Sequence, residues 1–357
     1  MFILRKTLLN PSTKIPSSPF HFSSRFFSNE TNFYPFTKTP KRFDTDIPTS
    51  AFYDKLIDEA GRSRDHTTLY RLLNKRYKDG CFNTSKTFKF LTETNAHFNT
   101  DLDDLVHIIC KVDKGFARKN AFDCLITCLC KSDCVNESVR VIESMIEKEV
   151  GVNAVTFWPL LNTLTRKRRI DEAWGVVEKM REYNVCVDIT AYNFILMGHC
   201  FEGDMKKAVE VLEKILEQGL KVDTRTYDAL VMGACRAGKV EGALLLLRKM
   251  EEEGVRVLYC THVHVITSLL GMGCFKLSFE FVMAFAGRDK ALDKENFGFL
   301  LNCLIKRRRV EEAKLVFFEM EDRGLAMGEK LKKEYEGLLL GEFPTKNRNK
   351  KSSLTLE

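Results

Sequence analysis

The sequence is poor in residues that break or interrupt folded structure. It has only 8 prolines and 20 glycines in 357 residues, which excludes collagen-like chains and Pro-rich linkers. No apolar run approaches the roughly 20 residues that a membrane-spanning helix needs. The longest obvious run, at 244–247, ends at Arg248. These absences favour a globular chain that does not cross a membrane.

The first 27 residues lack acidic side chains altogether. They contain Arg5, Lys6, Lys14 and Arg25 and are rich in Ser and Phe, a composition typical of an organelle transit peptide. Arg25 stands three residues before a predicted cleavage after Phe27. We predict a mitochondrial transit peptide at 1–27 and a disordered linker at 28–49. Chloroplast import, or an uncleaved basic tail, is the alternative.

The net charge of +7 is concentrated at the two ends of the chain. Besides the leader, the segment 342–357 is basic, and we predict that it forms a disordered tail. The middle of the chain is therefore close to neutral. Any contact with a polyanion has to come from local clusters of cations, because there is no general positive field.

A 35-residue period runs through most of the sequence. "RRIDEAWGVVEKM" at 168–180 returns as "RRVEEAKLVFFEM" at 308–320, an offset of four periods. Three columns repeat at this spacing. The small residues are Ser138, Ala173, Ala208, Ala243, Ser278 and Ala313. The large apolar residues are Met145, Met180, Ile215, Met250, Phe285 and Met320. The mainly aromatic column is Phe122, Phe157, Tyr192, Tyr227, His262 and Phe297.

Each unit has the pattern of two amphipathic helices. In the unit 189–223, for example, apolar residues recur at helical spacing on both sides of Gly203 and Asp204, which predict a turn and a helix cap. Because one hairpin cannot bury its apolar face alone, neighbouring hairpins should stack. We predict an all-α solenoid of about eight repeats: two degenerate ones at 50–118, six at 119–328, and a capping helix at 329–341.

These units resemble pentatricopeptide repeats. The resemblance rests on "VTFWPLLNTLTRKRRIDEAWGVVEKM" and "ITAYNFILMGHCFEGDMKKAVEVLEKILEQGLKVD", on the 35-residue length, and on Asp at the end of three units. It implies a right-handed superhelix of helix-turn-helix units and, in organelles, binding of single-stranded RNA with one nucleotide per repeat.

The resemblance also implies which residues read bases. In this family they are the residue after the aromatic and the last residue of the repeat. The candidates here are Asp123 with Asn153, Trp158 with Asp188, Asn193 with Asp223, and Asp228 with Leu258. Asn193 with Asp223 implies uridine. Val263 with Asp293 and Gly298 with Gly328 depart from the family pattern, since neither Val263 nor Gly298 has a hydrogen-bonding side chain. Trp158 is a candidate to stack on a base, or else it is partly buried packing.

A basic residue recurs near the end of the first helix of several units. The members are Arg62, Lys131, Arg166, Arg236 and Lys306. Members of the family can contact phosphates from this position, which predicts a backbone-binding edge. The alternative is that these cations only complement the C-terminal ends of helix dipoles.

No pattern in the sequence predicts catalysis, a cofactor or a metal. The H-x-E and C-x-x-C motifs of deaminases and the phosphate-loop pattern do not occur. Cys124, Cys128, Cys130 and Cys134 lack zinc-ligand spacing, and we expect reduced thiols packed in helices. The sequence therefore predicts a non-catalytic mitochondrial protein that binds single-stranded RNA in RNA stability, processing or translation. The alternative is a helical-repeat scaffold for protein assembly, for example on the mitochondrial ribosome.

Overall fold

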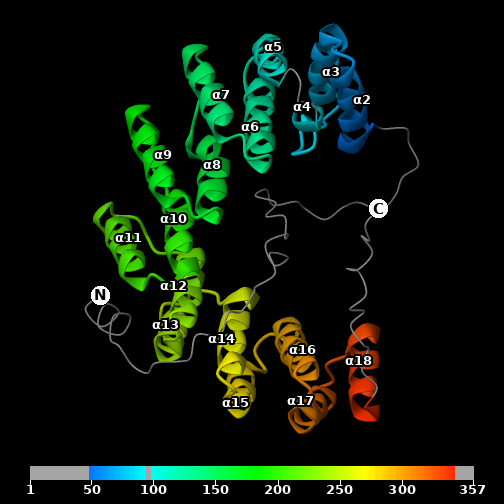
Figure 1. Ribbon diagram of the computed structural model, residues 1–357, viewed down its shortest axis with the longest axis vertical. Helices are drawn as coiled ribbons and strands as arrows, with labels where there is room; N and C mark the ends of the chain where they lie inside the picture. The colour runs from blue at the N-terminus through cyan, green and yellow to red at the C-terminus, as the bar shows by residue number, and fades with distance from the viewer. Residues whose placement is uncertain (1–47, 94–97, 342–357) are drawn as a thin grey trace, which may run out of the picture. The chain divides into compact units, whose positions relative to one another are not determined.

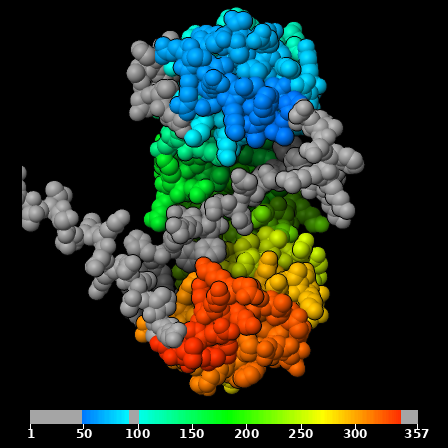
Figure 2. Space-filling view, turned by 90° about the vertical axis from the view of Figure 1, so that its right-hand side faces the viewer, coloured from blue at the N-terminus to red at the C-terminus, as the bar shows by residue number. Residues whose placement is uncertain are grey.

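The computed structural model describes residues 48–93 and 98–341. The predicted transit peptide, nearly all of the predicted linker, and the predicted basic tail lie outside these residues. The described chain is helical, with 17 helices and no strand. It divides into two compact units, with the division between Gly198 and His199, inside one helix. Each unit is a stack of helical hairpins whose side chains fill the spaces between the ribbons (Figure 1, Figure 2).

The N-terminal unit consists of hairpins built from α2 to α9. The helices are α2 (Ser50–Arg62), α3 (His66–Lys78), α4 (Lys89–Glu93), α5 (Phe98–Lys111), α6 (Phe116–Lys131), α7 (Val135–Glu147), α8 (Ala154–Arg166) and α9 (Ile170–Glu182). Helix α10 (Ile189–Glu202) follows and contains the division between the units. Within this unit α2 packs on α3, α6 on α7, and α8 on α9, while α6 also packs on α8.

The C-terminal unit repeats the same arrangement. Its helices are α11 (Met205–Glu217), α12 (Thr224–Arg236), α13 (Val240–Glu252), α14 (Tyr259–Gly271), α15 (Phe275–Phe285), α16 (Lys290–Lys306), α17 (Val310–Asp322) and α18 (Glu329–Leu340). The first helices α12, α14 and α16 pack in succession, and α18 packs on α16 and α17. The Tyr335 ring of α18 stacks on Phe317 at 4.5 Å between ring centroids.

Apart from the half-buried Phe285, the three sequence columns lie in the core of the stacks. All six members of the small-residue column have 0% exposure, and so have Phe122, Phe297 and Met250. A small side chain at this position lets the paired helices approach closely, and the aromatic column then fills the space between neighbouring hairpins. The predicted all-helical repeat fold is therefore confirmed.

The turn within each hairpin needs a left-handed residue. Gly203, Gly238 and Gly273 have φ of 75°, 71° and 76°, as the glycine in this column predicts. In two other repeats the same position holds Arg168 and Arg308, with φ of 62° and 57°. Arginine has a Cβ that disfavours this conformation, so these two turns form at a cost.

One repeat begins earlier than the 35-residue register predicts. Asp293 occupies the column in which Asp188 and Asp223 precede a first helix, but it lies inside α16. The helix begins at Lys290, and the Asp289 carboxylate caps it by accepting from the backbone N–H groups of Ala291 and Leu292. Asp293 instead accepts from Gly287 N at 2.8 Å and is buried. Helix α16 therefore begins one turn earlier, relative to the repeat, than the helices that follow Asp188 and Asp223.

Candidate nucleic-acid interface

Neighbouring first helices lie parallel and are joined by hydrogen bonds near both ends. In the N-terminal unit Thr156 of α8 donates to the Asp123 carboxylate of α6 at 3.1 Å, and Thr163 lies 3.4 Å from the Cys130 carbonyl. Both pairs are 33 residues apart. The same relationship joins α14 to α12 through Thr261 and Asp228. Equivalent residues of successive repeats therefore fall side by side.

The first predicted base-reading pair converges on the Thr156 hydroxyl. Asn153 caps α8 in a capping box with Thr156, whose hydroxyl also bonds Asp123. Lys119 Nζ forms an ion pair with the other Asp123 oxygen at 2.6 Å. Both carboxylate oxygens of Asp123 thus have protein partners. The structure brings Asp123 and Asn153 together, but through a residue that sequence reasoning did not select.

The second predicted pair is in direct contact. Trp158 Nε1 donates to Asp188 Oδ1 at 3.2 Å, and the same oxygen accepts from Ala191 N at the start of α10. Trp158 is half-buried, and Val155, one turn earlier on α8, is 39% exposed. The indole is therefore fixed at its nitrogen, with part of its ring accessible.

The third predicted pair is divided between the two units. Asn193 lies in α10 in the N-terminal unit and is 5% exposed. Asp223 belongs to the C-terminal unit, where it caps α12 by accepting from Thr226 N at 2.8 Å. The uridine preference that this pair implies stays a prediction.

Asp228 is enclosed by groups of the following repeat. Its carboxylate accepts from the Thr261 hydroxyl at 2.7 Å and from the Cys260 thiol at 3.3 Å, and His264 Nε2 lies 3.8 Å away. Burial lowers the pKa of His264, although the nearby carboxylate acts in the opposite direction. Leu258, the predicted partner of Asp228 in reading a base, makes no side-chain cap at α14.

A further member of this series was missed by sequence reasoning. Asp54 of α2 follows the buried Tyr53, and its carboxylate accepts from the hydroxyls of Thr84 and Thr87, both at 2.7 Å. The buried Arg76 guanidinium pairs with Asp54 at 2.8 Å. A sequence signal for these threonine contacts was present. In four repeats a threonine directly precedes the residue of the mainly aromatic column: Thr87, Thr156, Thr226 and Thr261.

The predicted phosphate-binding residues occupy equivalent places. Each is the last residue of its helix: Arg62 of α2, Lys131 of α6, Arg166 of α8, Arg236 of α12 and Lys306 of α16. All five side chains are exposed. Arg62 pairs with Asp58 at 2.8 Å, and Arg236 lies over the Phe201 ring at 3.9 Å. The column is thus regular in position.

The cations that follow this column are largely paired with acids. Lys167 forms an ion pair with Asp133 at 2.5 Å, and Arg169 pairs with Glu172 at 2.6 Å. Arg309 likewise pairs with Glu312. The clusters "RKRR" and "KRRR" therefore contribute less positive field than their composition suggests.

The twelve cysteines are free thiols, as expected. Burial raises the pKa of Cys124 to about 12 and that of Cys130 to about 11, so both remain protonated at neutral pH. In the described part of the chain, no three His, Cys, Asp or Glu side chains are grouped to hold a metal ion. Nor does any helix at 48–93 or 98–341 have the length and apolarity required to cross a bilayer.

Stacked helical hairpins with polar groups repeated along their first helices define a helical-repeat protein. Family models described as "Pentatricopeptide repeat-containing protein" and "PPR repeat" match residues 94–215, and 218–251 and 297–325, respectively. A mitochondrial pentatricopeptide repeat-containing protein of Arabidopsis thaliana is 65% identical over 285 residues, covering 80% of this chain and 81% of the relative. A second one from the same plant is 48% identical over 291 residues, covering 81% and 83%. The chain belongs to the pentatricopeptide repeat family, and these relatives place it in the mitochondrion, as its leader predicted.

Two solved structures are more distant. The crystal structure of the pentatricopeptide repeat protein PPR10 with an 18-nt psaJ RNA element is 17% identical, with a TM-score of 0.47. That match covers 80% of this chain and 40% of PPR10, so this chain spans less than half of that protein's length. The pentatricopeptide domain of Arabidopsis thaliana protein-only RNase P 1, in complex with tRNA, is 15% identical, with a TM-score of 0.32, and the match covers 61% of this chain and 97% of the domain.

Proposed function

We propose that this chain is a non-catalytic mitochondrial protein that binds single-stranded RNA and acts in RNA stability, processing or translation. The observation that carries the proposal is the regular repetition of polar groups along the first helices of each unit. Groups suited to bases recur near the starts of these helices, and cations recur at their last residues. Because α6 and α8 lie parallel, Lys131 and Arg166 stand at the same end of two packed helices.

The two ends of the first helices have different roles in this proposal. The cations contact phosphates, which gives affinity for any single strand and makes binding sensitive to salt. Trp158, held by Asp188, stacks on a base, and the uridine preference at Asn193 stays the prediction of the family pattern. Asp123 and Asp228 have a smaller part in base recognition, because their carboxylates are already engaged by Thr156 and Thr261.

The rival function is a scaffold for protein assembly, for example on the mitochondrial ribosome. One observation favours it: the carboxylates of the predicted reading residues Asp123 and Asp228, and that of Asp54 in an equivalent place, bind protein groups. This saturation leaves fewer polar atoms to recognise a base.

Ultraviolet crosslinking in isolated mitochondria tests the proposal. RNA that copurifies with the tagged protein under denaturing conditions should map to a limited set of transcripts. A Lys131→Ala/Arg166→Ala variant imported to the same level should lose most of this RNA. If no crosslinked RNA is recovered above an untagged control while other proteins copurify under native conditions, the scaffold function replaces the proposed one.

A further inference from the structure

Three aromatic side chains of the N-terminal unit contact one another at the surface. Tyr77 lies in the last turn of α3, Phe82 in the connection to α4, and Phe116 at the first residue of α6. The ring centroids are 6.3 Å apart for Tyr77 and Phe82, 6.1 Å for Tyr77 and Phe116, and 5.8 Å for Phe82 and Phe116. The side chains are 41%, 48% and 51% exposed, respectively. We call these three residues the aromatic platform; a contiguous apolar surface of this kind marks an interaction site more often than scattered residues do.

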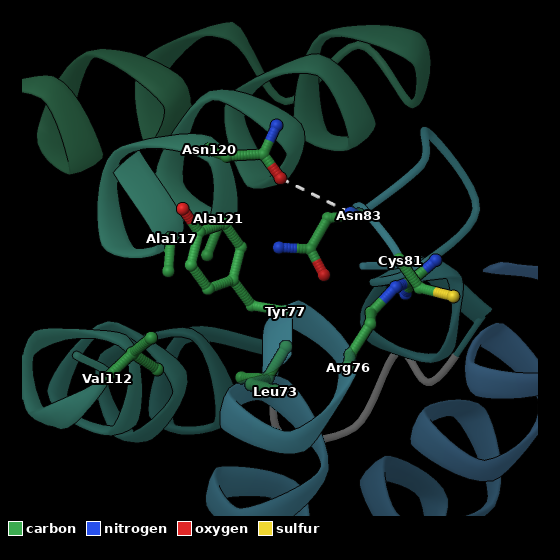
Figure 3. A pocket seen from close by; sticks show the side chains of 9 residues that line it. All are labelled: Leu73, Arg76, Tyr77, Cys81, Asn83, Val112, Ala117, Asn120 and Ala121. Atoms are coloured by element: carbon green, nitrogen blue, oxygen red, sulfur yellow. Dashed lines mark hydrogen bonds between the residues drawn. The ribbon is translucent and has the colours of Figure 1, made fainter. Parts of the chain in front are cut away.

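The space beneath the platform is too small for a ligand. Tyr77 lines a cavity of about 10 Å³ together with Asn83 and Asn120 (Figure 3). Such a volume admits a single water molecule and no base or cofactor. Anything that the platform binds has to contact the outer surfaces of its rings.

The chain around the platform is basic. The segments 75–89 and 111–119, which supply the three rings, contain nine Lys or Arg residues and two acids, Asp79 and Asp113. Two of the nine cations pair with acids outside these segments, because the buried Arg76 bonds Asp54 and Lys119 bonds Asp123. Lys75, Lys86 and Lys114 are exposed. This charge favours a polyanion over an apolar protein surface, and a polyanion that also uses aromatic rings is a single-stranded nucleic acid.

The platform borders a predicted base-reading position. Phe116, Asn120 and Asp123 are spaced by four and three residues on α6, so they share one face of that helix. Asn120 Oδ1 accepts from the backbone N–H of Asn83, the residue after Phe82, at 3.2 Å (Figure 3). An RNA strand that passes Asp123 can therefore continue onto the platform.

We infer that the aromatic platform stacks on a base of single-stranded RNA, while the lysines around it contact the neighbouring phosphates. The inference rests on the proposed RNA-binding function and adds a contact site outside the repeat-code positions. Recognition by stacking is tolerant of sequence, because every base has a π-face. The platform should therefore increase affinity without selecting one nucleotide.

Substitution of two platform rings in the full-length protein tests the inference. The Phe82→Ser/Phe116→Ser variant should bind a labelled 20-nucleotide RNA of mixed sequence about five- to tenfold more weakly than the unmodified protein. Its salt dependence should stay the same, because no phosphate contact is lost. Phe82→Trp should retain affinity, since it keeps an aromatic surface. The matched control is Phe318→Ser on α17, which removes an aromatic side chain that is 61% exposed.

The outcomes separate this inference from the proposed function. If the unmodified protein binds RNA and the double variant binds equally well, the platform inference is wrong and the proposed function stands. If the unmodified, folded protein does not bind RNA, both are wrong. A double variant that keeps RNA affinity but loses a copurifying protein also overturns the inference, because the platform would then be a protein-docking surface.

Photocrosslinking provides a test that does not depend on the folding of a variant. The unmodified protein is irradiated with 4-thiouridine-substituted RNA, and the attached peptides are identified by mass spectrometry. Crosslinks to Tyr77, Phe82 or Phe116 are expected. Crosslinks confined to other helices would contradict the inference.

Discussion

Thr156 donates its hydroxyl to the carboxylate of Asp123, 33 residues earlier, at 3.1 Å. Thr156 is fully buried, and it belongs to the same helix turn that Asn153 caps. Thr261 and Asp228 repeat this contact in the C-terminal unit, and Thr87 and Asp54 repeat it near the start of the described chain. A threonine thus fixes the register between successive first helices, and it holds a carboxylate that the family pattern assigns to base recognition.

Replacement of Thr156 by Val should destabilise the N-terminal unit by about 1–2 kcal/mol. The substitution keeps the shape of the side chain but removes both the bond to the Asp123 carboxylate and the hydroxyl's part in the capping box with Asn153. Urea unfolding, followed by circular dichroism, measures the free energy of unfolding. Thr67→Val on the exposed surface of α3 is the control, and it should change stability by less than about 0.5 kcal/mol. Equal effects of the two substitutions would show that the inter-repeat bond contributes nothing.

Ala208→Leu should destabilise the C-terminal unit by about 1–3 kcal/mol through overpacking. Ala208 has 0% exposure in α11, so the added carbons have no space unless the helices separate. Lys206→Leu adds a leucine to the exposed face of the same helix and serves as the control. Thermal unfolding that is unchanged in Ala208→Leu would contradict the close packing of the small-residue column.

Arg308→Gly should stabilise the turn between α16 and α17. Arg308 has a φ of 57°, where a Cβ costs about 1–2 kcal/mol, so its removal should stabilise the folded turn by that amount. Glycine also makes the unfolded chain more flexible, which offsets about 0.4–1 kcal/mol of this stabilisation. A net gain of about 0.5–1 kcal/mol is therefore expected in chemical unfolding. Arg307→Gly, one residue earlier, provides the contrast and should destabilise. A loss of stability in Arg308→Gly would mean that its side chain outweighs the backbone strain.

The stability of the C-terminal unit should fall between about pH 6.5 and pH 4 because of His262. Its ring is 1% exposed, lies 4.7 Å from the Phe285 ring and bonds Asn296 at 2.7 Å. Burial lowers the pKa of His262 to about 4, whereas an unfolded histidine titrates near about 6.5. The unfolded state therefore binds a proton first as the pH falls, and stability that is present above pH 6.5 is lost.

The variant His262→Phe isolates this effect. Phenylalanine occupies the same column in the next repeat, at Phe297, and it cannot titrate. The urea midpoint of the variant should decrease less between pH 7 and pH 5 than that of the unmodified protein. Some dependence should remain, because burial also lowers the pKa of His199 and His264. If the urea midpoint decreases equally in both proteins, His262 does not cause the pH dependence of stability.

The period of the sequence predicted the hairpins because each repeat carries its own local signals. Ala208 marks a close helix contact, and Gly203 with Asp204 marks a turn and a cap, without reference to distant residues. Helix α16 begins before Asp293 because the Asp289 carboxylate caps it one turn earlier. The sequence offers both Asp289 and Asp293 as caps, and the recurrence of Asp at positions 188, 223 and 293 could not show which of the two begins the helix.

The candidate site was less predictable because its contacts link different repeats. The base-reading positions of the family pattern include Asp123 and Asp228. Only the structure shows that the hydroxyls of Thr156 and Thr261 donate hydrogen bonds to these carboxylates. The aromatic platform was missed for the same reason. Phe116 reaches the other two rings only after two hairpins stack, and nothing in its local sequence indicates that contact.

Titration of the protein lacking residues 1–27 with short single-stranded RNAs at several salt concentrations tests the central claim most directly. Lys131→Ala and Lys306→Ala should each weaken binding to all sequences and reduce the log–log salt slope by roughly 0.7. Asn193→Ala should instead relax a preference for uridine at one position. Lys276→Ala is the control, because this lysine is 91% exposed but lies outside the first-helix column. A folded protein that binds none of these RNAs at physiological salt would contradict the account and leave the scaffold function in its place.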